Sequence, residues 1–256
     1  MMKVVILAGG LGTRLSEETN SIPKPMVEIG QIPMLIHIMR HYYHFGFKEF
    51  VILLGYKGNL IKEYFLNYPH NSKEFSIDFK NGKKELINDT SEDWKISFLD
   101  TGESTMTGGR IKRAENIIGN EDFMLTYGDG LSNVNLKALQ DFHKSHGKTA
   151  TMTSVLPTER FGVFTSENDK VTSFVEKPND SNSWINGGFF IFTNSIFDYL
   201  NSDNTSLEKE PLQSLANEGE LMTFRHKEFW KCMDTLKDKN ELQALWESGN
   251  PPWKIR

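Results

Sequence analysis

The sequence predicts an α/β fold: a Rossmann-like, doubly wound, mainly parallel sheet with a small added antiparallel β portion. Two patterns lead to this prediction. From residue 3 to about 155, apolar strand-like runs alternate with helical segments, as in parallel sheets built from β-loop-α-β units. From Thr158 onward the chain changes to short β segments separated by turns, which favour antiparallel pairing. No internal repeat or linker interrupts the 256 residues, so a single domain is expected.

The first strand, at 4–7, is a continuous aliphatic run that ends in a loop containing Gly9, Gly10 and Gly12. Because glycine has no Cβ, the backbone N–H groups of such a loop can turn toward an anion and approach it closely. The loop therefore predicts a phosphate site. Its spacing excludes a dinucleotide fingerprint, which has a third glycine, and a P-loop, which ends in Gly-Lys-Ser/Thr. The alternative is a glycine turn that only closes the strand.

Lys24 stands between two prolines, Pro23 and Pro25. Each proline fixes its own φ and biases the residue before it to extended geometry, so the lysine is presented from a stiff segment. An ammonium group held in this way loses less entropy when it binds a phosphate. A lone Lys-Pro would favour a solvated loop lysine, but this segment closely follows the glycine loop and Arg14.

The spacing of apolar residues predicts the remaining elements in order. Helices are expected at 33–44, 59–67, 111–118, 135–146, 196–200, 207–217 and 238–247. Strands are expected at 49–54, 95–99, 122–127, 149–155, 161–164, 171–175, 184–192 and 221–225. Asn81-Gly82 predicts a tight hairpin between 75–80 and 83–88.

Two more strands of this series end in polar loops. The strand at 95–99 leads into the loop 100–110, which opens a helix, and a helix N-terminus suits an anion or the polar edge of a base. The strand at 122–127 ends in Gly128-Asp129-Gly130, which places a carboxylate at the same edge of the sheet. Asp-Gly is also a common turn. The position of Asp234, just before the last helix, suits a helix N-cap.

Composition limits the function classes. The net charge of −5 argues against a nucleic-acid-binding protein, which would need a basic face. No apolar run reaches the roughly 18 residues of a membrane span, and no signal peptide is apparent, so we expect a cytoplasmic protein without a membrane partner. Cys232 is the only cysteine, which excludes an intrachain disulfide, and no Cys/His cluster has zinc spacing. Any metal should be held by carboxylates and phosphates.

The run Ala8-Gly-Gly-Leu-Gly-Thr-Arg14, followed by Pro23-Lys24-Pro25, resembles the signature of sugar-1-phosphate nucleotidylyltransferases. Arg160-Phe-Gly, Glu176-Lys-Pro and Asn186-Gly-Gly match later elements of that family in order. The resemblance covers the chain from Lys3 to about Arg256 and implies a fold of the nucleotide-diphospho-sugar transferase type. It is closest to the cytidylyl branch, which makes CDP-glucose from CTP and glucose 1-phosphate for surface polysaccharides and assembles as a homo-hexamer.

The resemblance also implies residue roles. Arg14 and Lys24 would be catalytic, and Arg110 would reach the phosphates. Nucleotide binding is implied for Leu7, Ala8, Gly9, Gly10, Leu11, Gly12, Thr13, Arg14, Lys24, Thr105, Gly109, Arg110 and Asp129. Sugar-phosphate binding is implied for Gly128, Glu176, Lys177, Asn186 and Gly187, and Mg²⁺ would lie between Asp129 and Asp234. Residues 1–155 would then be mainly the nucleotide half, 156–235 mainly the sugar-phosphate half, and 236–256 a C-terminal helix and tail.

The implied reaction needs no general base, because the attacking phosphate monoester is already an anion at neutral pH, with a second pKa of about 6. The obstacle is the approach of two polyanions, and phosphoryl transfer is catalysed mainly by positioning and electrostatic stabilisation. Arg14, Lys24, Arg110 and Lys177 would supply the positive charge. Two alternatives remain: the same reaction with dTTP or UTP, and a non-catalytic nucleotide-sugar sensor on the same fold.

Overall fold

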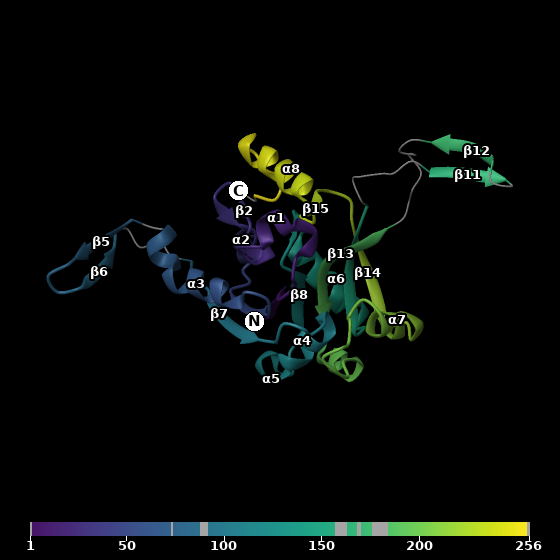
Figure 1. Ribbon diagram of the computed structural model, residues 1–256. Helices are drawn as coiled ribbons and strands as arrows, with labels where there is room; N and C mark the ends of the chain where they lie inside the picture. Colours follow the sequence, from purple (N-terminus) through teal and green to yellow (C-terminus); the bar gives the residue numbers. More distant parts are fainter. Residues whose placement is uncertain are drawn as a thin grey trace.

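A computed structural model describes residues 2–72, 74–87, 92–156, 163–167, 170–175 and 184–254. Its centre is a seven-stranded sheet with the order β14-β10-β13-β8-β1-β4-β7 (Figure 1). The strands of this sheet are β1 (Lys3–Ala8), β4 (Glu49–Leu54), β7 (Lys95–Asp100), β8 (Phe123–Tyr127), β10 (Ala150–Val155), β13 (Ile185–Phe192) and β14 (Leu221–His226). The order places β1, which carries the glycine loop, next to β8, which ends before Asp129.

The strand directions confirm the mainly parallel sheet. β1 is parallel to β4 and β8, β4 is parallel to β7, and β10 is parallel to β14. β13 is antiparallel to both of its neighbours, β8 and β10. This strand is therefore an inner strand of the main sheet, not part of a separate antiparallel addition. The physical reason is its sequence: 189–192 is a run of four buried apolar residues, which suits a strand covered on both faces.

Helices cover both faces of the sheet, as expected for a doubly wound fold. They are α1 (Ser16–Thr19), α2 (Met34–His44), α3 (Gly58–Ser72), α4 (Thr107–Arg113), α5 (Glu115–Ile118), α6 (Leu136–His146), α7 (Glu210–Asn217) and α8 (Leu236–Glu247). Short 3₁₀ turns form η1 (Thr13–Leu15), η2 (Lys24–Met26) and η3 (Asn194–Tyr199). In the described part, no helix is both long and apolar enough to cross a membrane.

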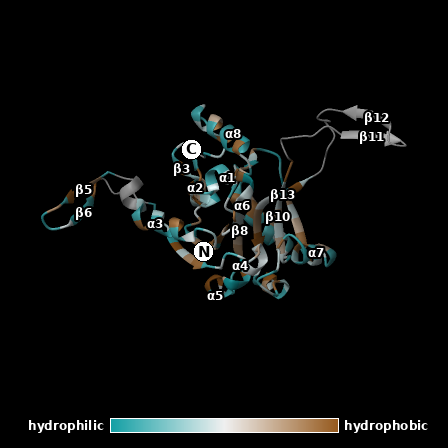
Figure 2. Ribbon diagram, viewed as in Figure 1, coloured by the Kyte–Doolittle hydropathy of each residue, from teal (hydrophilic) through white to brown (hydrophobic). Residues whose placement is uncertain are grey.

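The hydrophobic core lies on both sides of β1. Val4 and Ile6 face a cluster that includes α2, whereas Val5 and Leu7 face a second cluster that includes α4 and α5. Brown segments along β8 and β13 in Figure 2 mark the same apolar centre. Burial on both faces holds β1 rigidly, so the loop that follows it starts from a fixed point.

The helix predicted at 111–118 begins earlier and is split into α4 and α5. Gly108 and Gly109 lie inside α4, where a Cβ would meet the backbone of Thr205 at 2.8 Å and of Asp203 at 2.6 Å. The two glycines therefore let the first turn of α4 pack against the 203–205 loop. The segment predicted as a helix at 196–200 is the 3₁₀ turn η3, and α7 begins at Glu210.

The described residues also form four two-stranded sheets: β2 (Glu28–Ile29) with β3 (Ile32–Pro33), β5 (Phe75–Asp78) with β6 (Lys83–Leu86), β9 (Gly130–Ser132) with β15 (Trp230–Cys232), and β11 (Val163–Glu167) with β12 (Lys170–Val175). The hairpin predicted around Asn81-Gly82 forms as β5 and β6, but the two-residue turn is wrong: Asp78 pairs with Lys83, so the loop is the four residues 79–82. Gly82 ends this loop with a positive φ of 71°, and its N–H donates to the Asp78 carbonyl at 2.8 Å. This hairpin extends away from the sheet (Figure 1).

Candidate active site

A pocket of about 740 Å³ opens at the carboxyl ends of β1 and β8. It is lined by most of the residues that the sequence singles out: Leu7, Ala8, Gly9, Gly10, Leu11, Gly12, Thr13, Arg14, Lys24, Thr105, Arg110, Gly128, Asp129, Asn186, Gly187 and Asp234. Gly109 does not line it, because this residue packs behind the pocket on Asp203. Glu176, Lys177 and Arg160 lie outside the described residues. A residue that lines the pocket need not bind substrate or take part in catalysis, so the roles of these residues stay predictions.

The glycine loop is held in shape by backbone conformation and by one threonine. Gly12 has a φ of 66°, in the left-handed region that favours glycine, and directly precedes the 3₁₀ turn η1. The Thr19 hydroxyl donates to the carbonyls of Gly12 at 3.0 Å and Leu15 at 2.9 Å. A Cβ at Gly9 would lie 2.3 Å from a guanidinium nitrogen of Arg110. Gly9 is therefore required for close packing against Arg110.

Arg110 is buried beneath the glycine loop, with only 4% of its surface exposed. Its guanidinium donates five hydrogen bonds, to the carbonyls of Gly9, Leu54, Gly102 and Glu103 and to the Thr101 hydroxyl. No carboxylate within the described ranges forms an ion pair with it. Burial, followed by the nearby charge of Arg113, lowers the pKa of Arg110, with Asp100 acting in the opposite direction.

These contacts modify the expectation that Arg110 reaches the phosphates. Both terminal nitrogens already bind acceptors of the protein itself, and those acceptors come from three separate segments. Arg110 therefore ties the glycine loop to the end of β4 and to the loop after β7. Its positive charge still lies at the wall of the pocket.

Lys24 lies between two carboxylates. Its Nζ donates to Asp129 Oδ2 and to Asp234 Oδ1, both at 2.6 Å, and Arg14 contacts the other oxygen of Asp234 at 3.0 Å. Burial alone would lower the pKa of Lys24, but the charge of Asp129 and the hydrogen bonds to both carboxylates raise it above its usual value. Lys24 therefore remains charged, and the structure brings the two predicted catalytic cations to the two predicted metal ligands.

The two carboxylates meet because β9 pairs with β15. Cys232 lies opposite Gly130 in this pair, and the Met233 N–H donates to the Asp129 carbonyl at 2.9 Å. The N-cap interpretation of Asp234 is wrong: Thr235 caps α8, in a reciprocal capping box with Asp238. The carboxylate of Asp234 is thus available to the pocket.

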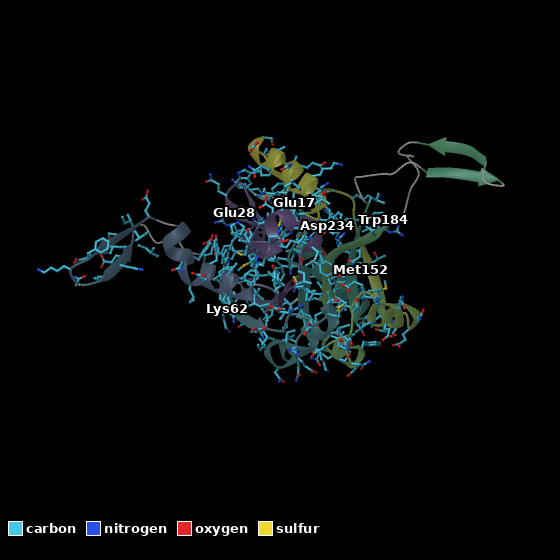
Figure 3. All side chains as sticks on the ribbon, in the orientation of Figure 1. Glu17, Glu28, Lys62, Met152, Trp184 and Asp234 are labelled. Atoms are coloured by element: carbon cyan, nitrogen blue, oxygen red, sulfur yellow. The ribbon has the colours of Figure 1, made fainter. Side chains whose placement is uncertain are left out.

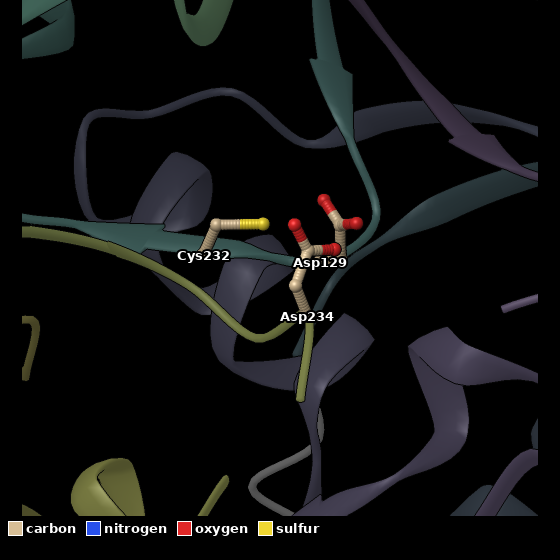
Figure 4. Close-up of side chains that lie close together, drawn as sticks. All are labelled: Asp129, Cys232 and Asp234. Carbon is tan, nitrogen blue, oxygen red and sulfur yellow. The ribbon is translucent and has the colours of Figure 1, made fainter. Parts of the chain in front are cut away.

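The donor set at this point fits a divalent cation. Asp129, Cys232 and Asp234 each offer a ligand atom, and these atoms lie within 4.8 Å of one another (Figure 4). Carboxylate oxygens are the ligands that Mg²⁺ prefers. Sequence reasoning missed Cys232, whose thiol pKa is raised mainly by burial. The signal was present, because in an extended segment a residue two positions before Asp234 points to the same side.

The far wall of the pocket is built by β13. Asn186 donates to the Tyr127 hydroxyl at 3.3 Å and accepts from the Gly188 N–H at 2.8 Å, so both ends of its amide are fixed. Tyr127 in turn donates to Glu208 at 2.6 Å, and Glu208 also accepts from Thr107 at the start of α4. Hydrogen bonds through Tyr127 and Glu208 therefore connect the predicted sugar side with the loop expected to face the base.

Comparisons with known proteins agree with this geometry. Residues 3–247 match the family model described as nucleotidyl transferase. The chain is 51% identical over 254 residues to the glucose-1-phosphate cytidylyltransferase of Salmonella typhi, covering 99% of each protein. It is 30% identical over 245 residues to the mannose-1-phosphate guanyltransferase of Saccharomyces cerevisiae, covering 93% of this chain and 62% of that protein. The fold also resembles the structure of UDP-glucose pyrophosphorylase complexed with UDP-glucose, with a TM-score of 0.69, 19% identity and coverage of 98% and 100%.

Proposed function

Because this chain belongs to the nucleotidyl transferase family, we propose that it joins CTP and α-D-glucose 1-phosphate to give CDP-glucose and pyrophosphate. One observation supports this choice of substrates above the others: identity of 51% to a glucose-1-phosphate cytidylyltransferase extends over 99% of both chains. The guanyltransferase relative, at 30% identity, supports the reaction type with a different base and sugar.

The pocket supports direct displacement. A phosphate oxygen of the sugar phosphate would attack the α-phosphorus of CTP in line, a new P–O bond would form, and pyrophosphate would leave with the electrons of the broken bond. Backbone N–H groups of the glycine loop would face the triphosphate, while Lys24 and Arg14 would stabilise the charge that gathers in the transition state. The attacking oxygen needs no deprotonation, which fits the absence of histidine among the described residues that line the pocket.

Family membership implies a divalent metal, and the proposed ion is Mg²⁺ held by Asp129 and Asp234. When bound, it would neutralise phosphate charge and orient the triphosphate. Asn186 and Gly187 would bind the sugar, with Tyr127 fixing the amide of Asn186. Glu176 and Lys177, outside the described residues, keep their proposed roles on the sugar phosphate, and the division into a nucleotide half and a sugar-phosphate half is proposed with them.

The proposed assembly is a homo-hexamer, as the resemblance implies. The β5–β6 hairpin supports self-association, because it exposes Phe75, Ile77 and Phe79, the last with 89% of its surface accessible. Exposed apolar clusters of this kind are typical of protein interfaces. Light scattering coupled to size exclusion measures the mass directly, and a monomer at micromolar concentration would contradict this part of the proposal.

Pyrophosphate release tests the reaction. The enzyme is given glucose 1-phosphate and Mg²⁺ together with CTP, UTP, dTTP, ATP or GTP, each alone. Strong preference for CTP is expected. Preference for UTP or dTTP would keep the reaction type and overturn the base, whereas no turnover with any nucleotide and several sugar phosphates would favour a sensor. The presence of Arg14, Lys24 and Asp129 in one pocket argues against the sensor.

A further inference from the structure

The ammonium group of Lys24 lies where the proposed metal would bind. It is 2.6 Å from an oxygen of Asp129 and 2.6 Å from an oxygen of Asp234, and its side chain is only 12% exposed. The guanidinium of Arg14 takes the second oxygen of Asp234 at 3.0 Å. Three of the four carboxylate oxygens therefore already contact a cation of the protein itself.

The formal charges of this cluster cancel. Two carboxylates face one ammonium and one guanidinium, so a free divalent cation meets no net negative charge here. It must also displace Lys24, whose positive charge repels it at short range in a partly buried site. Binding of a bare metal ion is thus opposed both by occupancy and by charge.

A nucleotide triphosphate changes this balance because it brings its own anions. Its phosphates offer Lys24 and Arg14 new partners, while a metal ion already chelated by those phosphates can take over the carboxylates. The backbone of the Lys24 segment need not move: Pro23 and Pro25 flank it, and the Met26 N–H donates to the Pro23 carbonyl at 2.8 Å. The lysine side chain has four rotatable bonds, so the ammonium group can change partners while the backbone stays in place.

We propose that Lys24 competes with the divalent cation for Asp129 and Asp234 and gives up these carboxylates only to a metal that arrives chelated by the nucleotide. This inference rests on the proposed function and specifies its substrate: the metal–nucleotide chelate, not free nucleotide added to a metal-loaded enzyme. Lys24 then has two roles in turn, as a counterion of the carboxylates and as a ligand of the phosphates.

A Mn²⁺ titration tests the proposal without any turnover. Binding is measured as the loss of the electron paramagnetic resonance signal of free Mn²⁺. The titration is made with and without a CTP analogue that carries a methylene group between the α- and β-phosphorus. Wild-type enzyme should bind Mn²⁺ at least about tenfold more tightly with the analogue. Lys24→Met, which keeps an unbranched chain but removes the charge, should bind Mn²⁺ alone at least about tenfold more tightly than wild type.

Three variants make the result specific. Lys62→Met, on α3 and apart from Asp234 in Figure 3, should leave Mn²⁺ binding unchanged. Arg14→Met should give a smaller gain than Lys24→Met, because Arg14 is 74% exposed and contacts one of the two carboxylates, Asp234. Adding Asp129→Asn to Lys24→Met should abolish the gain. If Lys24→Met folds poorly, the Mn²⁺ affinity of Arg14→Met provides a second test of the competition.

Two failures can be told apart. If Lys24→Met and Arg14→Met both bind Mn²⁺ alone no more tightly than wild type, while wild type binds it with the analogue, the competition is overturned and the metal site stands. If wild type does not bind Mn²⁺ even with the analogue, the metal site of the proposed function is itself contradicted.

Discussion

The guanidinium of Arg110 donates a hydrogen bond of 3.0 Å to the carbonyl of Gly9, across 101 residues of sequence. The same side chain binds Leu54, Thr101, Gly102 and Glu103. The glycine loop is thus held from below by a buried cation that belongs to α4. Its shape depends on Arg110 as well as on its own glycines.

Replacing Arg110 by lysine should therefore loosen the loop as well as the fold. A lysine keeps the charge but lacks the planar fork, so several buried carbonyls lose their donor. We expect a loss of about 2–3 kcal/mol in the free energy of unfolding, measured by urea denaturation, and a raised KM for CTP. Arg113→Lys is the control, because Arg113 is half-exposed and pairs with Asp203 at the surface; it should change the stability far less than Arg110→Lys does. Equal effects of both variants would contradict a special role for Arg110.

Gly9→Ala tests the same contact from the loop side. The new methyl group would lie 2.3 Å from the Arg110 guanidinium, which five hydrogen bonds hold in place. We expect a loss of about 1–3 kcal/mol in stability. Gly10→Ala is the matched control, since a Cβ there meets no atom within 4 Å, and its stability should change little. In the double variant with Arg110→Lys, the two losses should not add; strict additivity would mean that the residues act independently.

Local spacing and strand order were sufficient to predict the core of this site. The glycine loop follows β1 and Asp129 follows β8, and the carboxyl ends of parallel strands meet at one edge of a sheet. Lys24 comes soon after the glycine loop in the sequence, in a segment made stiff by two prolines. The partners of Arg110 could not be predicted in this way. They are backbone carbonyls from distant segments, and no sequence pattern tells whether a guanidinium faces a ligand or the protein itself.

The position of β13 shows a second limit of prediction from the sequence. Alternation and turns identified 184–192 as a strand, but they do not say which sheet a strand joins. The unbroken apolar run at 189–192 indicates burial on both faces, and it would have favoured an inner strand over an added one. The nearness of Cys232 to Asp234 follows from their two-residue spacing in an extended segment, but its nearness to Asp129 depends on the pairing of β9 with β15, which spacing does not give.

Loss of the Lys24 charge should affect turnover far more than folding. Lys24→Ala removes a cation whose proposed partners in the transition state are phosphates, so kcat should fall by about 10²–10³. The segment is a short 3₁₀ turn between loops, so the fold should be kept, with a melting temperature lowered by the loss of the ion pairs to Asp129 and Asp234. Steady-state pyrophosphate release measures the first effect and circular dichroism the second. Turnover within a few-fold of wild type would contradict a phosphate role for Lys24.

Two histidines of α2 should make stability depend on pH. Burial lowers the pKa of His37 and of His41 to about 4, although the Ile29 and Val134 carbonyls act in the opposite direction. His37 stays neutral with a fixed tautomer: its Nδ1 accepts from the Trp253 indole, so its Nε2 donates to the Ile29 carbonyl. In the described part of the chain neither ring nitrogen of His41 makes a hydrogen bond of normal geometry, although the Val134 carbonyl lies near enough to raise its pKa.

The direction of this pH dependence follows from the difference between the histidine pKa values of the unfolded and folded states. The unfolded chain protonates these histidines near pH 6.5, whereas the folded protein resists protonation until about pH 4. Stability is therefore complete above pH 6.5 and is lost as the pH falls toward 4, by roughly 3 kcal/mol at most for each histidine. Urea denaturation at pH 7.5, 6.0 and 5.0 measures this slope. His41→Leu should flatten it, because leucine cannot take up a proton. His44→Leu, at the exposed end of the same helix, should change the slope far less, although its charge contributes to the lowered pKa of His41. An equal slope in wild type and His41→Leu would show that His41 is not held neutral by burial.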